Sequence, residues 1–149
     1  MKKLLLGVVM AIVSVVACAA DKGTQDEAAA LVGKAVALVK AKGAEAALAE
    51  FNNPKGAFVD RDLYIFVIDK DGVTRANGNN SRLVGKNVLQ LRDADGNYFI
   101  KKFMEIGDTK GKGWAPEYKW PNAVTKAVET KQSYVEKVDD LYIGCGVYK

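Results

Sequence analysis

The chain has 149 residues, of which 27% are charged and 49% hydrophobic, with a formal net charge of +4 and no histidine. This length fits one domain with a single core. The absence of histidine excludes Ser-His and Cys-His nucleophile pairs and zinc sites with imidazole ligands. The basic residues are too few and too scattered to indicate a nucleic-acid-binding surface.

The first 20 residues have the layout of a bacterial secretory signal. Lys2 and Lys3 precede an apolar run over residues 4–16, and small residues follow. The apolar run is shorter than the roughly 20 residues that a membrane span needs. We therefore predict export to the periplasm, with a signal peptide at residues 1–20 and one mature domain at residues 21–149. Loss of the two leader lysines leaves a formal charge of +2.

The end of this leader has two interpretations. The small residues Ala17, Ala19 and Ala20 suit simple cleavage, which we favour and which removes Cys18. The residues up to Cys18 also loosely resemble a lipoprotein box, which would leave a lipid tether there. After simple cleavage Cys145 is the one remaining cysteine, so no internal disulfide is expected. Its apolar surroundings predict a small core residue rather than a nucleophile.

Two helices are predicted at the start of the mature domain. Thr24 and Glu27 form a capping-box signature, and apolar residues then recur at helical spacing, so the first helix begins near Gln25. Gly43 ends or bends this helix, and residues 44–51 continue as a second one.

The next motif is a buried strand that runs into a tight turn. Residues 63–68 are six aromatic or branched residues without a breaker, which predicts a strand covered on both faces. Asp71 and Gly72 suit a turn with positive φ, which folds residues 73–77 back as the second strand of a hairpin.

The second half of the chain predicts a crossover and three more strands. Within the crossover, residues 79–111, apolar spacing indicates a helix over about residues 97–106. Aromatic-rich stretches at residues 113–120, 133–138 and 141–148 follow. The order predicts an α+β domain with a five-stranded antiparallel sheet, the long N-terminal helix on one face and the helix-bearing crossover on the other.

A ligand pocket is expected between the sheet and the crossover. Aromatic rings exclude water there, and tyrosine and asparagine give directional hydrogen bonds; the alternative for each aromatic residue is a place in the core. Strand alternation puts Tyr64 and Phe66 on one face, and likewise Tyr118 and Trp120, whereas the direction of Trp114 depends on whether the nearby proline introduces a bulge. The candidate ligand-binding residues are Tyr64, Phe66, Asn77, Lys86, Trp114, Tyr118, Trp120 and Tyr134.

Four basic residues are candidates for pairing with a ligand carboxylate, although each is otherwise a solvated surface charge. They are Lys86, Arg92, Lys119 and Lys126. No periodicity selects among them, and the crossover position makes Lys86 the preferred one.

The aspartates do not predict a metal or catalytic site. Asp69 and Asp93 each begin an Asp-x-Asp-Gly run, but neither run has the glycine and glutamate that a calcium loop requires. We expect them to form turns. A carboxylate-only enzyme stays possible in principle.

Six stretches of the mature domain carry a family resemblance: residues 56–64, 83–87, 113–114, 118–120, 134–140 and 143–144. They resemble the single Cache domain family of bacterial chemoreceptors, sensor kinases and stand-alone exported proteins. The resemblance implies a PAS-like sheet, a pocket for ligands that are often small carboxylates, and no catalytic activity. Where related sequences commonly have histidine, this chain has Asn77, which keeps hydrogen bonding but loses the titratable charge.

The resemblance leads us to expect a periplasmic small-molecule sensor, for a short carboxylate or a related metabolite, in signal transduction or chemotaxis. Because only two residues follow Val147, the signal would pass to a separate membrane chemoreceptor or sensor kinase. We expect no cofactor, no nucleic-acid partner, and a monomer or homodimer. The alternative is a structural or accessory component of an exported complex whose aromatic residues all belong to the core.

Overall fold

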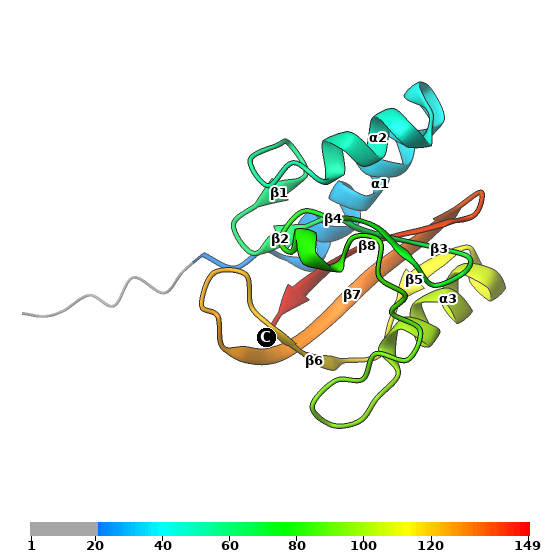
Figure 1. The fold of residues 1–149 in the computed structure, drawn as a ribbon. Coiled ribbons are helices and arrows are strands. Elements are labelled where there is room, and N and C mark those ends of the chain that lie inside the picture. The colour runs from blue at the N-terminus through cyan, green and yellow to red at the C-terminus, as the bar shows by residue number, and fades with distance from the viewer. Residues whose placement is uncertain (1–20) are drawn as a thin grey trace, which may run out of the picture.

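The computed structural model describes residues 21–149, which form an antiparallel sheet with helices on both faces (Figure 1). The predicted signal peptide at residues 1–20, including Cys18, lies outside the described residues. None of the helices within residues 21–149 has both the length and the apolar content needed to cross a membrane.

The two predicted N-terminal helices are confirmed as α1 (Gln25–Lys42) and α2 (Ala44–Phe51). The capping box is complete: the Glu27 amide donates to Thr24 Oγ1 at 3.2 Å, and the Thr24 amide donates to Glu27 Oε2 at 2.8 Å. Gly43 has φ +84°, a left-handed conformation that ends α1. The apolar stripe of α1 faces the sheet and contributes Ala28, Leu31, Val32, Ala35, Val36 and Val39 to the core.

The strands of the main sheet are β3 (Phe66–Asp69), β4 (Thr74–Asn77), β5 (Lys112–Trp114), β6 (Tyr118–Pro121), β7 (Val128–Val138) and β8 (Leu141–Tyr148). Their order in the sheet is β4-β3-β8-β7-β5, and β6 pairs with β7 beside β5. A separate two-stranded ladder joins β1 (Val59–Asp60) to β2 (Leu63–Tyr64). All pairs are antiparallel, as the sequence predicted.

The predicted hairpin is present between β3 and β4. Gly72 adopts φ +78°, and the carboxylate of Asp69 accepts hydrogen bonds from the amides of Asp71 and Val73. Asp69 therefore shapes a turn, as expected, and Asp93 does the same farther along the chain by accepting the amides at positions 95 and 97.

The aromatic stretch at residues 113–120 forms two short strands where one was predicted. β5 pairs with residues 134–136 and β6 with residues 128–131, along the same edge of β7. Pro116 lies in the gap, where it has no N–H to donate to the ladder. This break sets the direction of Trp114.

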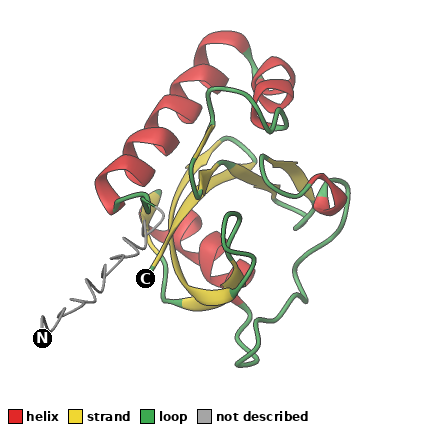
Figure 2. Cartoon of the chain, turned by 90° about the vertical axis from the view of Figure 1, so that its left-hand side faces the viewer, coloured by secondary structure: helices red, strands yellow, loops and turns green. Residues whose placement is uncertain are grey.

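The sheet separates two hydrophobic clusters, so it is covered on both faces as predicted. α1 and α2 cover one face, and α3 (Phe99–Lys110) with the preceding crossover covers the other (Figure 2). We call the hydrophobic cluster on the α1 side, which includes Val32, the α1 cluster, and the one on the α3 side, which includes Phe103, the α3 cluster. Because side chains alternate along the buried strand, Ile65 and Val67 lie in the α1 cluster, and Phe66 and Ile68 lie in the α3 cluster.

Cys145 is fully buried in the α1 cluster, which confirms its predicted place in the core. Burial raises the pKa of its thiol to about 12, so the thiolate needed for nucleophilic chemistry is strongly disfavoured.

Candidate functional site

A cavity of about 40 Å³ lies between the sheet and the α3 side of the domain. The sheet supplies part of its wall, α3 supplies another, and the crossover adds Leu83, Val88 and Leu91. The crossover is held over the hairpin by backbone hydrogen bonds, from the Thr74 amide to the Lys86 carbonyl at 2.9 Å and from the Val88 amide to the Gly72 carbonyl at 2.8 Å. The predicted location of the pocket, between sheet and crossover, thus coincides with a cavity.

The apolar wall is a set of packed aromatic rings. Phe99 and Phe103, one turn apart on α3, both face the sheet. The Phe99 ring stacks on Tyr118, with centroids 4.4 Å apart and planes 7° apart, and packs edge-on against Trp120 at 5.4 Å. Phe66 stacks on Phe103 at 5.4 Å. Such interlocked rings form a stiff, water-excluding surface.

Lys131 of β7 is the charged residue of this cavity. It is 1% exposed, and its Nζ donates to the Tyr64 hydroxyl at 2.8 Å. The Nζ also lies 4.1 Å from the ring centroid of Tyr64 and 4.6 Å from that of Tyr148. Within residues 21–149 no carboxylate lies within ion-pair distance of it.

The packing of β8 explains why a lysine fits there. A methyl group on Gly146 would lie 2.3 Å from Lys131 Cε, and one on Gly144 would lie 2.2 Å from Cζ of Phe66. These two glycines therefore leave the space that the lysine stem and the phenyl ring occupy on the cavity face of the sheet.

Two buried tyrosines, Tyr118 in the cavity wall and Tyr148 beside Lys131, are neutral hydrogen-bonding groups. Tyr118 Oη and Ser133 Oγ are 2.7 Å apart and both buried, and the Tyr148 hydroxyl donates to the Pro121 carbonyl at 2.8 Å. Burial is the main cause that raises the pKa of Tyr118 and of Tyr148 above the usual value of tyrosine. The phenols therefore keep their protons and can donate hydrogen bonds.

Asn77 closes the end of β4 at the cavity. Its Oδ1 accepts the amides of Asn79 and Asn80 at 3.1 and 2.8 Å, which fixes the start of the crossover. The other end of the same amide, Nδ2, is therefore the donor that Asn77 can offer to a ligand.

Five of the eight predicted site residues come together around this cavity: Tyr64, Phe66, Asn77, Tyr118 and Trp120. The two pairs predicted from strand alternation, Tyr64 with Phe66 and Tyr118 with Trp120, are both placed on the cavity side.

The structure does not bring Lys86, Trp114 and Tyr134 to the cavity. Lys86 is exposed on the crossover. Trp114 and Tyr134 are paired on neighbouring strands and pack edge-on, 5.4 Å apart, against the α1 cluster. They face away from the cavity because Ser133 and Val135, on either side of Tyr134, take the cavity face.

The other basic candidates do not line the cavity either. Arg92 donates to the Tyr98 hydroxyl, Lys119 Nζ donates to Thr130 Oγ1 at 2.7 Å, and Lys126 is exposed. Sequence reasoning missed Lys131. The available signal was strand alternation: Lys131 lies on the same face of β7 as Ser133 and Val135, and this face is buried.

Within residues 21–149 no cluster of three or more acidic, cysteine or histidine side chains could hold a metal ion. The cavity wall offers the ammonium group of Lys131, the amide of Asn77, several hydroxyl groups and aromatic rings. This donor set can bind and orient an anion.

Comparisons with known proteins agree with this fold. A family model described as Single Cache domain 2 matches residues 1–149. The sensor histidine kinase MctS of Rhizobium johnstonii is 34% identical over 90 residues, which are 59% of this chain and 19% of that protein. The chain thus spans about a fifth of the length of this curated relative.

Solved structures show the same fold at low sequence identity. A methyl-accepting chemotaxis protein from Vibrio parahaemolyticus superposes with a TM-score of 0.69 and 22% identity, covering 83% of this chain and 86% of that chain. A Cache chemosensory domain, solved to establish the structural basis of its carboxylic acid recognition, has a TM-score of 0.63 and 23% identity, covering 80% and 84%. With the family model matching its full length, the chain belongs to the single Cache domain family, whose members include sensor domains of chemoreceptors and sensor kinases.

Proposed function

We propose that this domain is an exported, non-enzymatic sensor that binds a short monocarboxylate through Lys131. The observation that carries the proposal is the buried ammonium group of Lys131, which has no carboxylate within ion-pair distance in the described domain and lies at the wall of a cavity. A buried charge is costly unless a counter-charge accompanies it, so the site favours an anion.

The hydrogen-bonding groups fit a carboxylate. Lys131 has two N–H groups beyond the one that it donates to Tyr64, and the Asn77 amide faces the same cavity. A charge-assisted hydrogen bond is about twice as strong as a neutral one. The aromatic wall formed by Phe99, Tyr118 and Trp120 would receive the alkyl end of the ligand.

The size of the cavity limits the ligand. A cavity of about 40 Å³ offers room for roughly three or four water-sized groups, since one such group needs about 10–15 Å³ on this measure. Acetate and propionate are of this size. The Cache chemosensory domain that shares this fold recognises a carboxylic acid, which is consistent with this ligand class.

The route of the signal is part of the same proposal. Relatives of this domain belong to chemotaxis proteins and to a sensor histidine kinase, so we propose a periplasmic location and a separate membrane chemoreceptor or sensor kinase as the partner. The non-enzymatic role is part of the proposal and is supported by the family and by the fold shared with the periplasmic sensor domain of a chemotaxis protein.

The test is calorimetric titration of the purified mature domain with acetate, propionate, butyrate and succinate, with propionamide as the neutral counterpart of propionate. We expect acetate or propionate to bind and propionamide not to bind. Lys131→Met should weaken binding by roughly 10- to 150-fold, the value of a hydrogen bond to a charged group, whereas Lys86→Met on the exposed crossover should leave it unchanged.

Two outcomes would contradict the proposal. Loss of binding in Lys86→Met but not in Lys131→Met would move the anion site to the crossover. No binding of any carboxylate by the folded wild-type domain would favour the accessory-component alternative.

A further inference from the structure

Two side chains of opposite charge are buried with unused hydrogen-bonding capacity. Asp62 is 2% exposed; its Oδ1 accepts the Gly23 amide at 2.7 Å, but its Oδ2 is buried without a partner. Lys131 donates to the Tyr64 hydroxyl and has two further N–H groups. The carboxylate of Asp93, in contrast, accepts four hydrogen bonds. An orphaned oxygen on a buried carboxylate is costly unless a positive charge compensates it.

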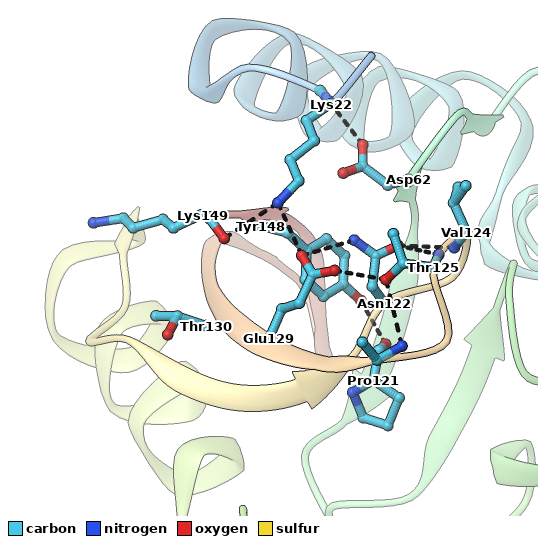
Figure 3. Close-up of polar contacts among 12 residues, drawn as sticks. Lys22, Asp62, Pro121, Asn122, Val124, Thr125, Glu129, Thr130, Tyr148 and Lys149 are labelled. Atoms are coloured by element: carbon cyan, nitrogen blue, oxygen red, sulfur yellow. Dashed lines mark hydrogen bonds and ion pairs between the residues drawn. The ribbon is translucent and has the colours of Figure 1, made fainter. Parts of the chain in front are cut away.

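Both charges lie beside the end of β8. The ring centroid of Tyr148 is 4.6 Å from Lys131 Nζ. The Lys22–Gly23 segment ties Asp62 to the chain end next to Tyr148, because the Gly23 amide donates to Asp62 and Lys22 Nζ donates to the Lys149 carbonyl (Figure 3). Burial is the main cause of the raised pKa of Tyr148, and the negative charge of Asp62 adds to it. Both charges also act on the thiol of Cys145. Burial is the main cause of its raised pKa; the charge of Lys131 lowers this pKa, and the charge of Asp62 raises it further.

The other cations around Asp62 already have carboxylate partners. Lys22 donates to Glu129 Oε2 at 2.9 Å and to a backbone carbonyl at the end of the chain (Figure 3). Arg61 binds the carboxylates of its acidic neighbours at 2.7 and 2.8 Å. Of these cations in the described domain, Lys131 is the one without a carboxylate partner.

We propose that Asp62 is the internal counter-charge of Lys131, and that an anionic ligand takes over this role when it enters the cavity. Asp62 is then a residue that sets the affinity of the site for anions without touching the ligand. Its negative charge stabilises the empty site and lowers the affinity for every anion. The part that concerns the ligand rests on the function proposed above; the coupling of the two buried charges does not.

The exchange of counter-charge also reaches the N-terminal end of the domain. The carboxylate that loses its counter-charge is the one that holds the Gly23 amide, and the neighbouring Lys22 is anchored to Glu129, two residues before Lys131 on β7. Occupancy of the cavity therefore changes the electrostatic environment of the segment that enters α1.

The first experiment is a double-mutant cycle in the ligand-free domain, with Asp62→Asn, Lys131→Met and both together. Asparagine keeps an acceptor for the Gly23 amide but removes the charge. In the wild-type background, Lys131→Met leaves the buried carboxylate of Asp62 without a counter-charge. In the Asp62→Asn background, the same substitution leaves no buried charge uncompensated. The loss of Tm on Lys131→Met should therefore be smaller by about 3 °C or more when Asp62 is already asparagine.

Asp140→Asn is the matched control, because Asp140 is exposed at the far end of the β7–β8 hairpin and its one ion-pair partner within residues 21–149 is the exposed Lys70. It should combine additively with Lys131→Met. Additive losses of Tm for Asp62→Asn as well would overturn the proposal. If Asp62→Asn does not fold, Asp62→Ser, another neutral acceptor, replaces it in the cycle.

The second experiment measures propionate binding by the Asp62→Asn domain. Removal of the competing charge should tighten binding by about threefold or more, and unchanged or weaker binding would overturn the exchange of counter-charge. If the wild-type domain binds no carboxylate while the cycle shows coupling, the proposed function fails and the charge pair stands.

Discussion

Replacing Tyr118 with phenylalanine removes one buried hydroxyl and keeps the ring. The hydroxyl lies 2.7 Å from Ser133 Oγ, and Ser133 is fully buried, so no solvent can replace the lost partner. The ring stacks on Phe99 with planes 7° apart, and phenylalanine can make the same contact. The variant therefore isolates the hydrogen bond.

The expected loss follows from this geometry. An unsatisfied buried hydroxyl costs about 1–3 kcal/mol. For a domain of this size, a loss of about 2 kcal/mol lowers Tm by roughly 6–10 °C. Ser133→Ala strands the Tyr118 hydroxyl in the same way, but the double variant Tyr118→Phe/Ser133→Ala strands neither group. It should cost about 1–2 kcal/mol less than the sum of the single variants.

Urea unfolding of the four proteins, followed by circular dichroism, measures this coupling. Additivity within about 0.5 kcal/mol would refute the hydrogen bond as a source of stability. Tyr118→Ala is not a suitable variant for this purpose. Loss of the buried ring would lower the free energy of unfolding by about 3–5 kcal/mol, so weaker ligand binding could not be separated from unfolding of the domain.

Two further predictions concern packing and acid stability. Gly144→Ala would place a methyl group 2.2 Å from Cζ of Phe66 and should lower the free energy of unfolding in urea by about 1–3 kcal/mol. Gly33→Ala, in open space on α1, should raise it by about 0.5–1 kcal/mol. Equal effects of the two substitutions would contradict the packing argument. The Thr24 amide, with help from Arg61, lowers the pKa of Glu27 to about 2 from 4.5. Because this pKa is lower in the folded state, the stabilisation is present above pH 4.5 and is lost as the pH falls toward 2. Glu27→Gln should therefore lose less stability than the wild type between about pH 5 and 2.5, and parallel losses in urea unfolding would argue against it.

The sequence alone predicted most of the local structure correctly. The capping box at Thr24, the turn at Gly72 and the strand buried on both faces are present. These features depend on neighbouring residues, because caps, turns and alternation are set by φ, ψ and side chains within a few positions. The predicted pairs Tyr64 with Phe66 and Tyr118 with Trp120 share the cavity side for the same reason.

The direction of Trp114 and Tyr134 was not predictable from a short window. Alternation gives two faces, but the identity of each face depends on which helix packs there. The break near Pro116 separates β5 from β6, and Trp114 then packs with Tyr134 on the α1 side.

The sequence by itself thus determined an α+β domain with a sheet between two covers, because periodicity and turn chemistry are local. Only the tertiary structure decided which cation belongs to the cavity. Lys131 looks like an ordinary surface lysine in the sequence. It is buried because Gly146 of β8 leaves space for its stem and the Tyr64 hydroxyl accepts a hydrogen bond from its ammonium group. Its hydrogen bond to Tyr64 joins residues 67 positions apart, which no local pattern specifies.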